Sequence, residues 1–264
     1  MSIKIKHWGL VGLLALSVSC GTDDEETTTT ATTAADETDT SSDNFTLNGA
    51  GEGVASLLQS TPAEASLSIY QFAVSESEDC SNPTVVIDNG DTPAEFDMLS
   101  SPEIGTGTIP DGTYPCVVLV MAPSLSVTPA TTEGSCTAGQ AISQNVCSGG
   151  GDSEGQTINL DGELVGCGES TDKAYLYLST GSTLTNAVQN TDACDWENPR
   201  ACSSWEPPTA EDSNLGVPLG AALVVSGTEI GVFKLGDLAV GEEGDENDPS
   251  CGMGRPTFTF VSGE

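Results

Sequence analysis

The sequence predicts an all-β protein, an antiparallel β-sandwich stapled by disulfides that follows a disordered tether. Three observations predict this fold. Short stretches of alternating apolar and polar residues recur along the chain, and turn residues separate them, among 30 glycines and 14 prolines. No amphipathic helix is interleaved with these stretches, because the one helical candidate, 53–60, is too short to be stable alone. Eight of the nine cysteines lie within the strand-rich part of the chain.

The first 19 residues have the features of a secretory signal peptide. Lys4 and Lys6 precede an apolar run from Trp8 to Val18, and no acidic residue interrupts it. As a helix this run would be about 16 Å long, against a bilayer hydrocarbon core of about 30 Å. Residues 1–19 are therefore predicted to direct secretion rather than to span a membrane.

The residues that close this segment, Leu16-Ser17-Val18-Ser19-Cys20, resemble the lipobox of bacterial lipoproteins. Ser17 stands where that family usually has a leucine, and the resemblance ends at Gly21. It implies that Cys20 carries several fatty-acyl chains, such as palmitate, which together anchor a protein firmly in the lipid bilayer. Gly21 in place of an aspartate implies the outer membrane of a Gram-negative bacterium, with the periplasmic and cell-surface faces both open. The alternative is an ordinary signal peptide cleaved nearby.

The number of cysteines agrees with acylation of Cys20. Removing Cys20 leaves an even number, which suits full pairing in an oxidising compartment. Each disulfide would contribute typically about 2–4 kcal/mol. Eight cysteines permit about 105 pairings, and the ease of closing short loops makes Cys136–Cys147 and Cys194–Cys202 the predicted pairs. The eight disulfide candidates are Cys80, Cys116, Cys136, Cys147, Cys167, Cys194, Cys202 and Cys251.

Residues 20–43 are acidic and threonine-rich and lack apolar periodicity, so they are predicted to form an extended, disordered tether. Without residues 1–19, the chain keeps four basic residues against forty acidic ones, a formal charge of −36. Such a protein has no basic patch and repels nucleic acid, so no nucleic-acid partner is expected. A second acidic run, 242–248, is predicted to be a solvated loop.

Residues 44–264 are predicted to form the β-sandwich region, as one domain or as two sub-domains divided near 130–150. Turn signals such as 88–91, 110–112 and 161–162 separate its strands. The predicted strands are 67–74, 84–87, 114–121, 157–160, 174–178, 221–225, 230–235 and 257–261.

One predicted hairpin, Ile109-Pro110-Asp111-Gly112-Thr113-Tyr114-Pro115-Cys116-Val117-Val118, resembles a hairpin of small prealbumin-like sandwiches. The likeness covers this hairpin alone. It implies a prealbumin- or immunoglobulin-like arrangement of the strands.

The residue types exclude several kinds of catalysis. His7 is the one histidine and lies in the signal peptide, so the mature chain has no imidazole for a nucleophilic triad or for His-ligated zinc. No phosphate-binding loop or dinucleotide fingerprint is present. A protein that is not an enzyme is therefore expected. The alternative is an extracytoplasmic hydrolase, such as a glycoside hydrolase, that uses a pair of carboxylates.

Two groups of residues are candidate binding sites. Acidic turns offer oxygen ligands for calcium at Asp88 and Asp91, and at Asp245 and Asp248. Trp196, Arg200 and Trp205 lie in or beside the predicted Cys194–Cys202 loop and could form a ligand surface, for example by stacking on sugar rings. The alternative is that the tryptophans pack over the disulfide.

These features predict a membrane-anchored extracytoplasmic lipoprotein with a non-catalytic binding, adhesion or structural role. Its expected partner is the lipid bilayer, through acylated Cys20, and the sequence identifies no protein or carbohydrate partner. No cofactor is expected unless the acidic turns bind calcium, in which case the protein would be a calcium-stabilised binding module.

Overall fold

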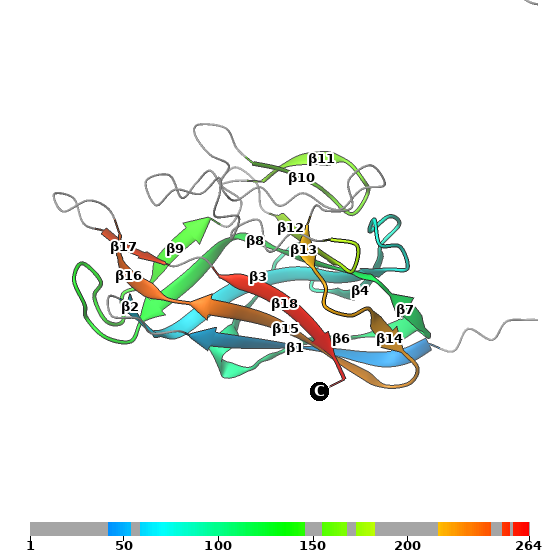
Figure 1. Cartoon of the computed structure of the whole chain (residues 1–264), viewed down its shortest axis with the longest axis horizontal. Helices are drawn as coiled ribbons and strands as arrows, with labels where there is room; N and C mark the ends of the chain where they lie inside the picture. The colour runs from blue at the N-terminus through cyan, green and yellow to red at the C-terminus, as the bar shows by residue number, and fades with distance from the viewer. Residues whose placement is uncertain are drawn as a thin grey trace, which may run out of the picture. The chain divides into compact units, whose positions relative to one another are not determined.

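The computed structural model of the chain describes residues 42–53, 59–145, 155–167, 173–182, 216–243, 250–253 and 256–263 (Figure 1). It confirms the predicted fold class, because two sheets of β-strands enclose one apolar core. The one helix within these ranges, η1 (Met98–Ser100), is a single 3-10 turn. Residues on both sides of 130–150 belong to the same large sheet, since β8 (Cys116–Pro129) pairs with β12 (Ala174–Ser179).

The small sheet has four strands in the order β18-β15-β1-β6. These are β18 (Thr257–Ser262), β15 (Glu229–Leu238), β1 (Ser42–Gly53) and β6 (Glu103–Pro110). β1 pairs with β15 in parallel, with Phe45 opposite Glu229, although the sequence predicted antiparallel strands. The difference arises because β1 is the first strand of the body and β15 a late one, so the long chain between them can return in either direction.

The large sheet follows the order β13-β12-β8-β3-β4, and β5 and β9 pair with β3 and β8 respectively. Besides β8 and β12, it contains β13 (Val217–Pro218), β3 (Pro62–Ser75), β4 (Thr84–Asp88), β5 (Ala94–Asp97) and β9 (Ile142–Asn145). β12 and β13 are the second parallel pair. β3 and β8 are the longest strands of this sheet and pair along most of their length.

Three short sheets complete the described structure. β10 (Gly155–Ile158) pairs with β11 (Leu164–Cys167), and β7 (Gly112–Tyr114) pairs with β14 (Leu223–Val225). The third contains β17 (Ser250–Met253), β16 (Val240–Glu243) and β2 (Gln59–Ser60).

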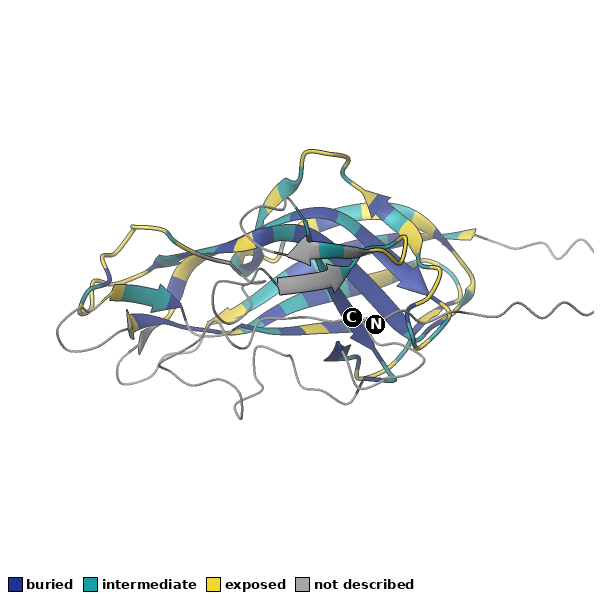
Figure 2. Ribbon diagram, turned by 90° about the horizontal axis from the view of Figure 1, so that it is seen from above, coloured by how far each residue is buried: buried dark blue, intermediate teal, exposed yellow. Residues whose placement is uncertain are grey.

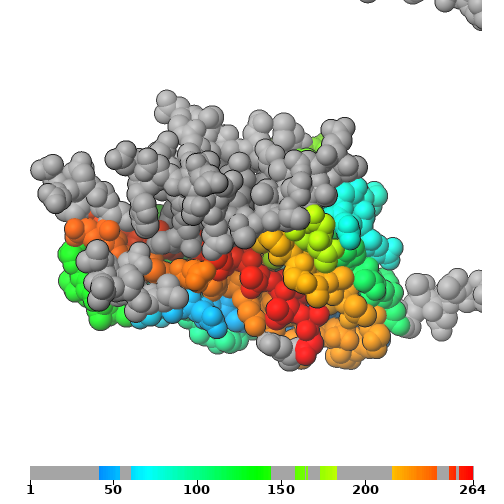
Figure 3. All heavy atoms as spheres, in the orientation of Figure 1, coloured from blue at the N-terminus to red at the C-terminus, as the bar shows by residue number. Residues whose placement is uncertain are grey.

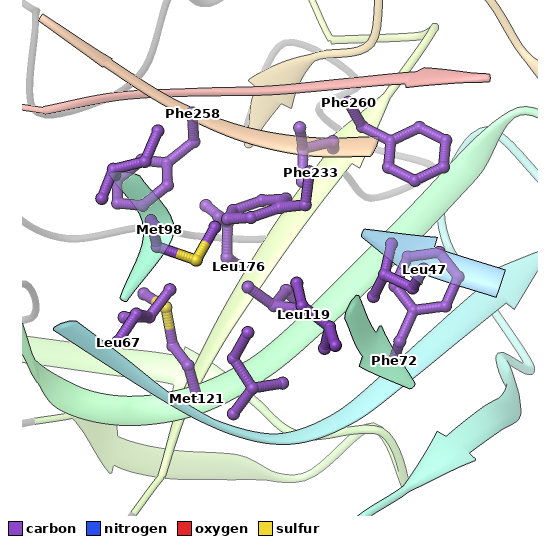
Figure 4. Packing of buried hydrophobic residues seen from close by; sticks show 14 of the residues in the cluster. Leu47, Leu67, Phe72, Met98, Leu119, Met121, Leu176, Phe233, Phe258 and Phe260 are labelled. Carbon is purple, nitrogen blue, oxygen red and sulfur yellow. The ribbon is translucent and has the colours of Figure 1, made fainter. Parts of the chain in front are cut away.

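The core lies between the inner faces of the two main sheets, which alternation along each strand makes apolar. The rings of Phe45 on β1 and Phe72 on β3 stack with centroids 5.4 Å apart. The Phe72 ring also stacks on that of Phe260 on β18, with centroids 5.7 Å apart. Figure 4 shows side chains from both sheets pointing toward each other, with Met121 of β8 and Met98 of η1 in the same cluster. Buried residues follow the long strands, and exposed ones gather in the turns (Figure 2).

Two glycines on β6 let the sandwich close along one side. Gly107 lies opposite Phe45, and Gly105 lies opposite Leu47, so both face the core. A Cβ atom at Gly107 would lie 2.0 Å from the carbonyl oxygen of Val86, and one at Gly105 would lie 2.8 Å from the Ile87 side chain. The edge strands of the two sheets, β6 and β4, therefore meet here with no room for a side chain on β6.

The predicted strand 114–121 is instead two strands that separate at Pro115. β7 pairs with β14, whereas β8 pairs with β3 and β12. Tyr114 lies two residues before Cys116. Its hydroxyl donates a hydrogen bond to the Pro110 carbonyl, 2.7 Å away. This is the geometry of the tyrosine corner of Greek-key sandwiches, and it fixes the bend between β6 and β7.

The outer face of the large sheet is apolar as well. Across β12, β8 and β3, one row of outward residues consists of Tyr177, Val118 and Ala73, all buried. They form a second cluster with the disulfide Cys80–Cys116, and Leu160 from the turn after β10 packs against it. The chain itself therefore covers the outer face of the large sheet.

Replacing Tyr177 with phenylalanine is expected to detach the β10–β11 hairpin from this face. The Tyr177 hydroxyl donates to the carbonyl oxygens of Ile158 and Asn159, at 2.8 and 3.2 Å. Losing such a bond costs about 0.5–1.5 kcal/mol, and the urea midpoint of Tyr177→Phe should fall accordingly. Burial also raises the pKa of Tyr177, so its contribution is complete below pH 10 and is lost as the pH rises further. The variant should therefore show a smaller loss of stability above pH 10, and an unchanged alkaline transition would contradict the burial of the Tyr177 hydroxyl.

The structure corrects one predicted disulfide. Cys136 pairs with Cys251, with Cα atoms 4.7 Å apart, and not with Cys147. The prediction favoured the shortest loop, but strand pairing determines which cysteines meet. Cys251 lies on β17 opposite Glu242 of β16. The Glu242 carboxylate in turn accepts a hydrogen bond from the Ser135 amide at 2.9 Å. These contacts bring residue 136 to β17. Cys147, Cys194 and Cys202 lie outside the described residues, as does the side chain of Cys167.

Three predicted boundaries also change. β1 begins at Ser42 and so includes the last two residues of the predicted tether, because Asp43 already pairs with Ile109. In the predicted helix 53–60, Gly53 ends β1 and Gln59–Ser60 is a strand paired with β16, while 54–58 lie outside the described residues. In the predicted acidic loop, Glu242 and Glu243 belong to β16.

The other predicted strands are found, with shifted ends. Those at 67–74, 84–87, 174–178, 230–235 and 257–261 lie within β3, β4, β12, β15 and β18. The strand predicted at 157–160 ends at Ile158, and the one predicted at 221–225 begins at Leu223.

Candidate functional site

Acidic side chains meet at the end of the sandwich where the body of the chain begins. Asp43 lies at the start of β1 and pairs across the strands with Ile109 of β6, which places Asp111 diagonally beside it. On the other side, the parallel register of β1 and β15 places Gly227 and Glu229 beside Asp43 and Phe45. We call Asp43, Asp111 and Glu229 the carboxyl cluster.

A shared hydrogen bond is the main feature of the carboxyl cluster. The hydrogen bond with the Asp111 carboxyl raises the pKa of Asp43, followed by partial desolvation and by the negative charges of Asp111 and Glu229. The Gly227 amide, which donates to the Asp43 carboxylate, opposes these effects. The Asp43 carboxyl therefore keeps its proton to a higher pH than an isolated aspartate, at a solvent-exposed position.

The sequence did not point to this cluster, because Asp43 was assigned to the tether. Only the pairing of β1 with β6 and β15 brings these residues together. Carboxylates that cleave glycosidic bonds stand about 5–9.5 Å apart, with room for a sugar or a water between them. Asp43 and Asp111 are in direct hydrogen-bond contact, so this pair does not have the geometry of the predicted alternative, a carboxylate-pair hydrolase.

Removing Asp111 is expected to change how stability depends on pH. Because the pKa of Asp43 is raised above its ordinary value of 3.8, the stability that the pair contributes is present below that value and is lost as the pH rises through the folded pKa. Asp111→Asn should lower the pKa of Asp43, so the melting temperature of the variant relative to the parent should increase between pH 4 and pH 7. Thermal unfolding across this range measures the difference.

Asp91→Asn, in the exposed turn after β4, is the control for the loss of one acidic charge. Its melting temperature relative to the parent should change less with pH than that of Asp111→Asn. Equal changes in the two variants would show that net charge, rather than the shared hydrogen bond, causes the effect.

The calcium candidates Asp88 and Asp91 lie in the turn between β4 and β5. The Asp88 carboxylate accepts the Gly90 amide at 2.8 Å, and the neighbouring Asn89 side chain donates to the Ile69 carbonyl at 3.1 Å. These contacts shape the turn, in which Gly90 has a φ of 78°. Within the described ranges, no three histidine, cysteine or acidic side chains gather as a metal site. Calcium binding at this turn stays a prediction.

The one described cation–π contact lies beside the covered outer face of the large sheet. The Lys173 ammonium stands 4.8 Å from the centre of the Tyr70 ring. Nearby, burial and then the charge of Asp161 raise the pKa of Tyr175. The Lys173 contact links the residue before β12 to β3, across the intervening strand β8.

The remaining predicted site residues lie outside the described residues. They are Cys20, Trp196, Arg200, Trp205, Asp245 and Asp248. The acylation site, the tryptophan surface and the second calcium turn therefore stay predictions.

We found no match between this chain and any protein-family model, curated protein or solved structure. In the part of the chain that the structure describes, no helix has the length and apolar character needed to cross a membrane.

Proposed function

We propose that this protein is an extracytoplasmic lipoprotein, held by acylated Cys20 in the outer membrane of a Gram-negative bacterium, with a non-catalytic binding, adhesion or structural role. The observation that carries the proposal is the segment Leu16–Cys20, which follows a short apolar run and precedes an acidic, threonine-rich stretch. The attachment chemistry assigned to Cys20 rests on its resemblance to a lipobox.

The cysteines of the body support an oxidising compartment. All four cysteines whose side chains the structure describes are paired, as Cys80–Cys116 and Cys136–Cys251. Disulfides persist outside the cytoplasm and are rare within it. Because Cys20 is the odd cysteine of nine, acylation gives it a role that pairing does not.

The architecture supports a role that does not require catalysis. A mature chain without histidine lacks the commonest general base, and the carboxyls of Asp43 and Asp111 are too close for glycoside hydrolysis. A rigid sandwich with a formal charge of −36 resists aggregation and keeps its surface solvated. A tether of about 20 residues would carry this body away from the bilayer.

Metabolic labelling with a clickable palmitate, followed by intact mass measurement from native membranes, tests the anchor. The parent should carry label and begin at Cys20, and Cys20→Ser should carry none. Ser17→Leu, which restores the usual lipobox residue, is the matched control and should be labelled at least as fully as the parent. An unlabelled parent would contradict the proposed acylation of Cys20. Eight reduced thiols in the body would contradict the proposed location in an oxidising compartment.

A further inference from the structure

The sequence contains two asparagine–glycine dipeptides, Asn48-Gly49 and Asn89-Gly90. Such a dipeptide can lose ammonia without an enzyme. The main-chain nitrogen of glycine can reach the carbon of the asparagine side-chain amide, because glycine has no Cβ atom to hinder the approach. The structure places the two dipeptides in different surroundings, since Asn48 lies within β1 and Asn89 lies in the turn between β4 and β5.

The turn after β4 favours this reaction at Asn89. The Gly90 amide donates a hydrogen bond to the Asp88 carboxylate at 2.8 Å, so a base already holds the proton that this nitrogen must lose. Gly90 has a φ of 78°, and a Cβ atom there would have no neighbour within 4 Å, so a ring and water have room around it. Asp88 and Gly90 are both exposed to solvent.

Two hydrogen bonds hold Asn89 itself. Its main-chain amide donates to the Tyr70 carbonyl at 2.8 Å, and its side-chain amide donates to the Ile69 carbonyl at 3.1 Å. The first bond fixes the residue at the end of the β3–β4 pair, and the second must break when ammonia leaves. The second bond therefore slows the reaction relative to an unfolded chain, but it removes neither the attacking nitrogen nor the base.

The surroundings of Asn48 oppose the same reaction. The Gly49 amide donates to the Pro102 carbonyl at 2.7 Å, and this acceptor is neutral. β1 lies between β6 and β15, and Figure 3 shows the atoms of β1 (blue) and β15 (orange) side by side. A Cβ atom at Gly49 would lie 2.8 Å from the Met98 side chain, so the backbone there has no room to fold into a ring. Asn48 is therefore an internal control.

We propose that Asn89 is a site of spontaneous deamidation, in which the Asp88 carboxylate accepts the Gly90 amide proton. The Gly90 nitrogen forms a bond with Cγ of Asn89, the bond from Cγ to Nδ2 breaks, and the proton leaves with Nδ2 as ammonia. Water then opens the resulting succinimide to aspartate or isoaspartate. The net reaction consumes one water, releases one ammonia and oxidises nothing. The inference concerns the body of the chain and does not depend on acylation of Cys20.

Either product loosens the end of the β3–β4 pair. The Ile69 carbonyl loses its donor and faces a new carboxylate, in a turn that already carries Asp88 and Asp91. Isoaspartate also adds a methylene group to the main chain, next to the hydrogen bond with Tyr70. Deamidated protein, separated by anion exchange, should melt about 2–4 °C below the parent, the shift for losing one hydrogen bond in a domain of this size. An unchanged melting temperature would overturn this consequence.

Peptide mapping by mass spectrometry, after incubation of the folded protein at neutral pH, follows both asparagines in one sample. Asn89 should convert at least tenfold faster than Asn48. In guanidinium chloride, with the disulfides reduced, the two should convert at similar rates, because only the local sequence then matters. Equal rates in the folded protein would overturn the proposal, and so would an Asn89 that converts in denaturant and stays intact in the folded protein.

Asp88→Asn tests the role of the base, since it keeps an oxygen that can accept the Gly90 amide but removes the carboxylate. It should slow the conversion of Asn89 at least threefold. Glu95→Gln, which removes an exposed acid on β5, is the matched control and should leave the rate unchanged. An undiminished rate in Asp88→Asn, or equal slowing by both variants, would overturn the role of Asp88. Far-UV circular dichroism and melting temperature of each variant show that the substituted chains remain folded.

Discussion

Replacing Gly107 with alanine is expected to lower the free energy of unfolding by about 3 kcal/mol, near the upper end for overpacked interiors. The new methyl group would lie 2.0 Å from the Val86 carbonyl oxygen, a backbone atom that no rotamer change can move. Relief therefore requires β4 or β6 to shift, and with them the closed side of the sandwich. Urea unfolding of parent and variant measures the change.

Gly220→Ala is the control for this substitution, because a Cβ atom at Gly220 has no neighbour within 4 Å. It should leave stability unchanged or raise it by up to about 1 kcal/mol, since alanine restricts the unfolded chain. If Gly107→Ala also left stability unchanged or raised it, the close approach of the Val86 backbone to Gly107 would be contradicted.

Removing the disulfide Cys136–Cys251 is expected to cost more stability than removing Cys80–Cys116. The first bond joins residues 115 apart in sequence and the second joins residues 36 apart. The loop-entropy relation gives about 5 kcal/mol and about 4 kcal/mol respectively, out of the roughly 5–15 kcal/mol that stabilises a typical protein. Urea midpoints of the two double alanine variants test the order, and equal midpoints or the reverse order would contradict it.

Non-reducing peptide mapping checks the pairs themselves. Peptides containing Cys136 and Cys251 should be linked, and a link between Cys136 and Cys147 would contradict the structure. With Cys20 acylated, Cys147, Cys167, Cys194 and Cys202 remain, and an even count predicts that they pair with one another in one of three ways.

Local patterns predicted the strands best where core residues recur along the strand. The pattern along 67–74 marks β3, because Leu67, Ile69, Phe72 and Val74 contact the core, with a bulge after Ile69. The glycine turn at 88–91 is also found, since Gly90 adopts a left-handed conformation that glycine favours. β6 was missed because its core-facing positions include Gly105 and Gly107, which have no side chain to mark them as buried.

The candidate site was less predictable than the fold. The carboxyl cluster combines the beginning of β1, the end of β6 and the beginning of β15, which are far apart in the sequence. Nothing near Asp43 in the sequence indicates that the Asp111 carboxyl will lie beside it and raise its pKa.

The sequence by itself determined that this protein is built from β-strands, carries a large negative charge and holds enough cysteines for disulfides. These properties depend on composition and on contacts between near neighbours, which any reader of the chain can count. The tertiary structure alone decided which strands run parallel and that Cys136 reaches Cys251. Those outcomes depend on contacts between residues distant in sequence, and many arrangements of similar local energy compete until the whole core is packed.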